Sequence, residues 1–329
     1  SIVLAALQVI TAIILAFWAP GFHTITSEKD EEALKNARQS IPASLMDALD
    51  KAATQRHLLV ATDFDGTLAP LVRNPRKAAP IPGSLEALDT LATIPHTKAA
   101  IVSGRDIAGL RKVAPVTRDV TLVGSHGAEI SDSDHELTKH QRDLLKRLIE
   151  EVTQTADSIP GATIEEKKYA VVLHTRTAQD PHEAKKRTVE LEERLSAVPG
   201  VTLTRGKKVS EFAVINTTKD AALASLAARW PTGADAILYL GDDVTDEHIF
   251  TGLPARITTP QTEIITVKVG EGDTAAQYRI ANELEAAAVL DYLCEQRNHY
   301  ANAHFTWKDR KQHRKDSRSR ARRMAYSAD

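Results

Sequence analysis

Residues 58–68 read Leu-Leu-Val-Ala-Thr-Asp-Phe-Asp-Gly-Thr-Leu, an apolar run that ends abruptly in two acidic residues. A short run of this kind is typical of a strand buried on both faces, as in a parallel sheet. Ligands of such sheets bind at the carboxyl ends of the strands. Asp63 and Asp65, which follow the run at once, are therefore candidate site residues.

Further apolar runs repeat this arrangement along the chain. Residues 98–103 lead into Ser103-Gly104-Arg105, residues 121–124 lead into Ser125, and residues 236–240 lead into Gly241-Asp242-Asp243. Helical spacing of leucine and alanine separates the runs. Strands that alternate with helices predict an α/β fold, with a Rossmann-like doubly wound parallel sheet.

The middle of the chain has another pattern, in which a helical stretch and two strand-like runs occur twice. This pattern predicts an α+β cap domain with an antiparallel sheet, inserted into the core. The predicted division is a helical connector at residues 28–56, a core at 57–129 and 214–295, and a cap at 130–213.

Both ends of the chain depart from a globular composition. Residues 1–27 form an apolar segment without charge up to Phe22, and the length allows a membrane anchor or a buried helix. Residues 296–329 are basic and poor in aliphatic side chains, which predicts a disordered tail. A solvated tail is favoured over an arm that binds polyanions.

Composition limits the function classes. The 329 residues carry a net charge of −2, so no nucleic-acid partner is expected. The one cysteine, Cys294, excludes an internal disulfide and a cysteine-rich zinc site. A cytoplasmic setting fits, with membrane contact through residues 1–22 left open, and the oligomeric state is not predicted.

The pair Asp63 and Asp65 suits phosphate chemistry with a bound cation. An aspartate can attack phosphorus, and a second carboxylate two positions on can protonate the leaving oxygen and then activate water. Oxygen atoms from Asp63 and from the backbone carbonyl of Asp65 suit Mg²⁺, which prefers hard ligands. The structural alternative is a pair of turn aspartates.

Other polar groups at strand ends complete a candidate site. Ser103 and Gly104 can bind phosphate oxygens, and Lys219 at a helix start can neutralise phosphate charge. The acidic loop that contains Asp242, Asp243 and Asp246 repels itself unless a cation or strong donors compensate it. A capped helix start explains Asp246 but not the acids at the strand end.

These motifs, in this order, resemble the haloacid dehalogenase superfamily of phosphotransferases. The resemblance implies that Asp63 is the nucleophile, Asp65 the acid/base group, and Ser103, Gly104 and Lys219 the phosphate ligands. It also implies Mg²⁺ bound by Asp63, Asp65 and Asp242, with its surroundings oriented by Asp243 and Asp246.

Further motifs look like the trehalose-6-phosphate phosphatase family: Ser125-His126-Gly127-Ala128-Glu129, Glu165-Glu166-Lys167, His174-Thr175-Arg176, Gly206-Lys207-Lys208-Val209-Ser210-Glu211 and Val269-Gly270-Glu271-Gly272-Asp273-Thr274. The resemblance implies a hydrolase of trehalose biosynthesis, which converts trehalose 6-phosphate to trehalose and phosphate through an aspartyl-phosphate. It implies substrate contacts by His126, Glu129, Lys167, Arg176, Lys207 and Glu211.

Two alternatives stay open at this point. The first is another sugar-phosphate phosphatase, acting on sucrose phosphate or a glycosyl-phosphoglycerate. The second is a non-catalytic, tethered binding module. One departure from the family pattern is Asp220, beside Lys219, which we expect to face solvent because a carboxylate near phosphate is unfavourable.

Overall fold

The computed structural model describes residues 27–133, 137–215, 217–259 and 261–326. The apolar segment predicted at residues 1–27 lies outside this range except for Ser27. Among the helices in the described ranges, none is both long and apolar enough to cross a membrane.

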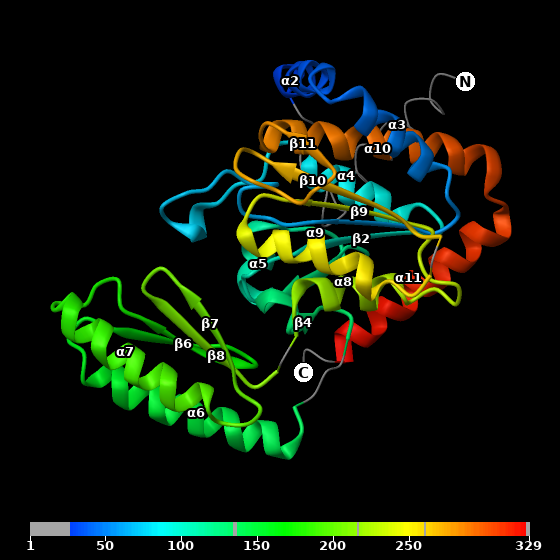
Figure 1. The fold of residues 1–329 in the computed structure, drawn as a ribbon. Helices are drawn as coiled ribbons and strands as arrows, with labels where there is room; N and C mark the ends of the chain where they lie inside the picture. Colours follow the sequence, from blue (N-terminus) through cyan, green and yellow to red (C-terminus); the bar gives the residue numbers. More distant parts are fainter. Residues whose placement is uncertain (1–26, 134–136, 216, 260, 327–329) are drawn as a thin grey trace, which may run out of the picture.

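A seven-stranded sheet forms the centre of the larger part of the molecule (Figure 1). Its strand order is β11-β10-β9-β1-β2-β3-β4, and every pairing is parallel except that of β3 with β4. This arrangement confirms the predicted doubly wound α/β core. The strands are β1 (Leu58–Thr62), β2 (Thr97–Val102), β3 (Thr121–Gly124), β4 (Glu129–Ile130), β9 (Ala236–Gly241), β10 (Glu263–Val269) and β11 (Tyr278–Ile280).

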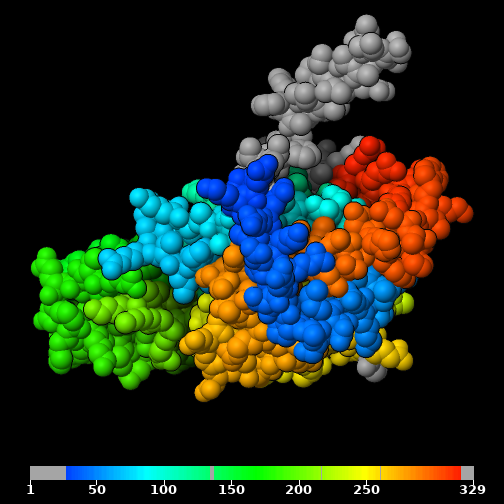
Figure 2. Space-filling view, turned by 90° about the horizontal axis from the view of Figure 1, so that it is seen from above, coloured from blue at the N-terminus to red at the C-terminus, as the bar shows by residue number. Residues whose placement is uncertain are grey.

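Helices cover both faces of the sheet, which is why β1 is apolar at nearly every position and fully buried. Leu58 and Val60 pack into one hydrophobic cluster, and Leu59 and Ala61 pack into the other. In Figure 2, α2 and α3 (blue) lie across the outer surface of the core beside α10 (orange). The first face carries α2 (Glu28–Gln39), α3 (Ala43–Ala53), α4 (Ser84–Thr93), α5 (Ile107–Val113) and α10 (Glu283–His304), and the second carries α8 (Lys219–Ala227) and α9 (Val244–Arg256).

A smaller unit, the cap, contains a four-stranded antiparallel sheet of order β5-β6-β8-β7 with two helices on one face (Figure 1). Val171, Leu173 and Phe212 point to those helices, so their neighbours Val172 and Glu211, which pair across β6 and β8, lie on the other face. The elements are α6 (Lys139–Asp157), β5 (Thr163–Glu166), β6 (Ala170–His174), α7 (Pro181–Ser196), β7 (Thr202–Gly206) and β8 (Val209–Ala213). The sequence-based division placed Ile130 in the cap, with the core ending at residue 129. Because β4 pairs with β3 through Ile130, we propose that the first boundary lies after Ile130 and keep the other boundaries unchanged.

The prediction of a disordered tail at residues 296–329 is wrong for the residues described. Helix α10 continues to His304 and a further helix, α11 (Trp307–Tyr326), follows. Arg297 is fully buried and donates to the backbone carbonyls of Ala53, Arg56 and His96, among others. Apolar content alone could not predict this order, because specific polar contacts hold the segment on the core.

Candidate active site

Three polar side chains meet at the carboxyl edge of the central sheet. Asp63 follows β1, Ser103 follows β2 and Asp242 follows β9, and these strands are neighbours. They line a cleft of about 650 Å³ between core and cap. The predicted site residues that line this cleft are Asp63, Asp65, Ser103, Gly104, His126, Lys167, Lys219, Asp242 and Asp243.

Lys219 ties the site together at the start of α8. Its Nζ donates to Asp63 Oδ1 and to Asp246 Oδ1, both at 2.8 Å, and it is 5% exposed. Burial would lower the pKa of Lys219, but Asp63 and Asp246 outweigh burial and raise it, so the ammonium stays charged. Burial raises the pKa of Asp63 well above its ordinary value, with further contributions from Asp246 and Asp242.

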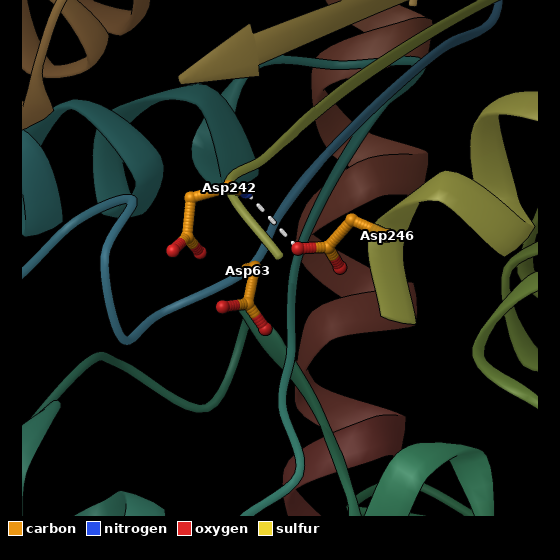
Figure 3. Close-up of side chains that lie close together, drawn as sticks. All are labelled: Asp63, Asp242 and Asp246. Carbon is orange, nitrogen blue, oxygen red and sulfur yellow. Dashed lines mark hydrogen bonds between the residues drawn. The ribbon is translucent and has the colours of Figure 1, made fainter. Parts of the chain in front are cut away.

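Asp246, in the first turn of α9, anchors the acidic loop. Its Oδ1 accepts from Lys219 and from the Tyr239 hydroxyl, and its Oδ2 accepts from the backbone N–H groups of Asp242 and Asp243. Figure 3 shows the bond from the Asp242 backbone to Asp246. A carboxylate has about four acceptor positions, so Asp246 is fully engaged. Its contacts suit a group that orients the loop rather than a metal ligand.

The carboxylates of Asp63 and Asp242 fit a hard divalent cation. Asp63, Asp242 and Asp246 each place one oxygen within 4.8 Å of the others (Figure 3). Burial, with help from Asp246 and Asp243, raises the pKa of Asp242 to about 6. Gly66, at φ +83°, permits this approach, because a Cβ there would lie 2.1 Å from Asp242 Oδ2. An excess of negative charge at this edge is what a cation would neutralise.

Asp65 is not a member of that cluster, and its carboxylate pairs with Arg105. The guanidinium donates from Nε to Oδ2 and from Nη2 to Oδ1, both at 2.6 Å, and this bond raises the pKa of Arg105. Asp65 can thus reach a cation through its backbone carbonyl, as proposed from the sequence, rather than through its side chain. Sequence reasoning missed Arg105, although its place directly after Ser103-Gly104 was a signal.

The turn after β3 brings His126 against Gly104, at the end of β2. Ser125 and His126 adopt φ of 49° and 53°, and a Cβ on Gly104 would lie 2.6 Å from His126 Cε1. Burial lowers the pKa of His126, and Lys219 lowers it further. Glu129 does not line the cleft. It is buried and accepts a hydrogen bond from Ser125 at 2.5 Å. It supports the turn.

The cap residues divide into two groups. Lys167 lines the cleft and donates to Glu211 at 2.6 Å, on the face of the cap sheet away from its helices. Lys207, in the turn between β7 and β8, and Arg176, after β6, are exposed and do not line the cleft. Of the four predicted cap residues, the structure thus brings Lys167 to the cleft, and Glu211 is bound to Lys167 without lining the cleft itself.

The expectation that Asp220 faces solvent is wrong. Asp220 is 6% exposed and accepts a hydrogen bond from Arg256 of α9. The expectation failed because Arg256 lies 36 positions further along the chain, and the local sequence around Asp220 gave no sign of this partner. The Asp220–Arg256 pair joins α8 to α9 beside the site.

Comparison with known proteins gives one family. Residues 61–283 match the family model described as trehalose-phosphatase. A trehalose-phosphate phosphatase of Mycobacterium tuberculosis is 30% identical over 298 residues, which are 84% of this chain and 72% of that protein. A solved trehalose-6-phosphate phosphatase of Aspergillus fumigatus is similar with a TM-score of 0.57 and 28% identity, covering 77% of this chain and 97% of the other.

Some relatives are much longer than this chain. An uncharacterized glycosyl hydrolase of M. tuberculosis is 33% identical over 74% of this chain, which spans 19% of that protein. A bifunctional trehalose-6-phosphate synthase/phosphatase of Thermoproteus tenax is 32% identical over 83% of this chain, which spans 37% of that protein. The family match covers both core and cap and confirms the resemblance of the motifs, so the chain belongs to the trehalose-phosphatase family.

Proposed function

We propose that the protein hydrolyses trehalose 6-phosphate to trehalose and phosphate. The observation that carries this proposal is the position of Asp63. It is buried at the end of β1 against the charged Lys219, and it faces a cleft to which the cap contributes Lys167. Family membership supports trehalose 6-phosphate as the sugar phosphate.

In the first step, a carboxylate oxygen of Asp63 attacks phosphorus and the bond between phosphorus and the sugar oxygen breaks. Asp65 gives its proton to the leaving sugar oxygen, and later takes a proton from the water that hydrolyses the aspartyl-phosphate. Asp65 is bound to Arg105 in this structure. The acid role therefore requires that Asp65 leave Arg105 when substrate binds.

The proposed phosphate ligands come from two elements. Ser103 and Gly104 lie at the end of β2 and Lys219 lies at the start of α8. Lys219 keeps its charge between Asp63 and Asp246, so it can stabilise negative charge that develops on the phosphoryl oxygens. Asp63, the Asp65 carbonyl and Asp242 would hold Mg²⁺, with Asp243 and Asp246 shaping the loop. When bound, Mg²⁺ would offset the repulsion between these carboxylates and the phosphate dianion.

The cap would recognise the sugar. Lys167 lines the cleft and is bound to Glu211, and His126 approaches from the core. Lys207 and Arg176 are exposed here, so we propose that they contact the sugar after the cap moves closer to the core. Glu129 would act through the turn that carries His126.

The test is phosphate release from a panel of sugar phosphates, with Mg²⁺ and in excess chelator. Trehalose 6-phosphate should give the highest kcat/KM and the reaction should require Mg²⁺. Preference for sucrose phosphate or a glycosyl-phosphoglycerate would contradict the named substrate. Absence of turnover on every member of the panel would favour a binding module.

A further inference from the structure

Helix α11 presents two different faces. Asp309, His313 and Ser317, spaced by four residues, turn to the core. Asp309 bonds His96 at 2.7 Å, His313 bonds the carbonyl of Ala92 at 3.0 Å, and Ser317 bonds Asp119. Positions three and four apart share one side of a helix, so these contacts fix which side of α11 is outside.

The outer side is a basic stripe. It comprises Lys308, Lys311, Lys315 and Arg318, spaced by three, four and three residues, and all four are exposed. The exposed Trp307, with 64% of its surface accessible, lies at the start of the same side, and Lys311 Nζ lies 4.8 Å from its ring centroid. The stripe thus combines four cationic side chains with one exposed aromatic ring.

Charge is unevenly divided along the chain. Residues 307–326 contain nine Lys and Arg and two Asp, a net charge of +7, while the whole chain carries −2. The remaining residues therefore carry −9. A positive helix on a negative body orients the molecule toward an anionic surface through that helix.

The stripe lies far from the proposed catalytic cleft. The residues that α11 contacts, such as His96 and Asp119, precede β2 and β3, whereas Asp63 and Ser103 follow β1 and β2. Since these strands are parallel, α11 lies at the amino edge of the sheet and the cleft at the carboxyl edge. A surface bound to α11 would leave the cleft open to small substrates.

We propose that the outer face of α11 docks on an anionic lipid bilayer. Lysine and arginine near such a surface attract acidic headgroups, and tryptophan favours the boundary between headgroups and acyl chains. Residues 2–22, which contain no charged residue, offer an apolar segment in the same chain. A basic face and an apolar segment together bind a bilayer more firmly than either alone. A nucleic-acid duplex would be bound mainly through its phosphate charges. It would give no role to the exposed tryptophan or to the apolar segment, so a bilayer is the favoured partner.

The experiment compares the full chain on vesicles of phosphatidylcholine with vesicles of equimolar phosphatidylcholine and phosphatidylglycerol. The ratio of the two binding constants isolates charge, because an apolar segment binds both. The variant Lys311→Glu/Lys315→Glu/Arg318→Glu leaves the side of α11 that contacts the core unchanged. The matched control is Lys146→Glu/Lys185→Glu/Lys186→Glu on the exposed side of the cap helices. Circular dichroism checks the fold of each.

The parent and the control should prefer anionic vesicles, and the α11 variant should lose at least roughly 100-fold in that ratio, since each basic residue contributes about fivefold and the new glutamates add repulsion. High salt should weaken binding of the parent. If the triple reversal does not fold, Lys311→Gln/Lys315→Gln should lose roughly 25-fold instead. Equal binding to both vesicles, equal loss in the control, or tighter binding to an RNA duplex than to anionic vesicles would overturn the proposal.

Discussion

The two sides of the cleft differ in how firmly their charged groups are held. On the core side, Asp63, Lys219 and Asp246 are buried, and Lys219 donates to both carboxylates at 2.8 Å. On the cap side, Lys207 and Arg176 are exposed, and Lys167 has one strong partner, Glu211. Groups held in a buried network need no rearrangement to act on charge, whereas exposed groups must be brought to the substrate. Under the proposed function, the core therefore supplies the chemistry and the cap supplies recognition of the sugar.

The largest effect should follow from Asp63→Asn. The amide cannot attack phosphorus, so kcat should fall by at least ~1000-fold, about 4 kcal/mol of barrier. The measurement is release of phosphate from trehalose 6-phosphate, with circular dichroism to check the fold. Asp157→Asn, at an exposed position of α6, is the matched control and should keep full activity. Activity of Asp63→Asn within about tenfold of the parent would refute the nucleophile assignment.

Removal of divalent metal should come next, with a loss of at least ~100-fold that Mg²⁺ restores. The pKa of Asp242 is raised to about 6, so this carboxyl is charged above that pH and protonated below it. Protons and Mg²⁺ then compete for Asp242, and the Mg²⁺ concentration for half-maximal rate should rise as the pH falls through about 6. A Mg²⁺ requirement that is constant down to pH ~5 would exclude Asp242 as a ligand.

Glu211→Ala should produce a smaller and more selective loss. It removes the partner of Lys167 and a carboxylate that can accept from sugar hydroxyls, and a charged hydrogen bond contributes about 1.5–3 kcal/mol. We expect kcat/KM for trehalose 6-phosphate to fall about 10- to 100-fold, and that for an aryl phosphate to change little. Glu193→Ala, on the exposed side of α7, is the control. An equal loss on both substrates would make Glu211 structural rather than specific.

The smallest effect should be that of Lys207→Ala. Because Lys207 is exposed in a hairpin turn, it contacts sugar only in a closed cap, and an exposed charge contributes about 1 kcal/mol or less. The expected change is roughly a threefold rise in KM with kcat unchanged. A loss as large as that of Glu211→Ala would show that the turn is held over the substrate as firmly as the core groups are. The contrast between core and cap would then be wrong.

Much of the core could be predicted, because strands such as β1 are apolar runs that are recognisable in the sequence. The candidate site residues, such as Asp63, follow these runs directly. The contacts of those residues could not be predicted. Asp65 pairs with Arg105 from the next strand end, and Asp220 pairs with Arg256 from the next helix. Both partners are charged residues of ordinary appearance. Their roles come from strand order and helix packing, which local patterns do not contain.

The C-terminal segment also shows that local sequence does not reveal tertiary contacts. Residues after Arg297 have few apolar side chains, and composition therefore indicated disorder. In the structure, α11 is held by Asp309, His313 and Ser317, three polar residues on one face of the helix. A polar helix face of this kind can be recognised in the sequence only when its hydrogen-bond partners on the core are known.

By itself, the sequence determined the fold class, the insertion of a cap and the chemical groups available at the strand ends, because periodicity and residue type act over a few neighbouring positions. Tertiary structure decided which groups act together. Lys219 reaches Asp63 across 156 positions of the chain, and this contact depends on how α8 packs beside β1. It also decided that Asp246 orients the acidic loop while Asp242 keeps its carboxylate toward Asp63. Distances between residues far apart in sequence are set by packing, and the residue types alone do not specify them.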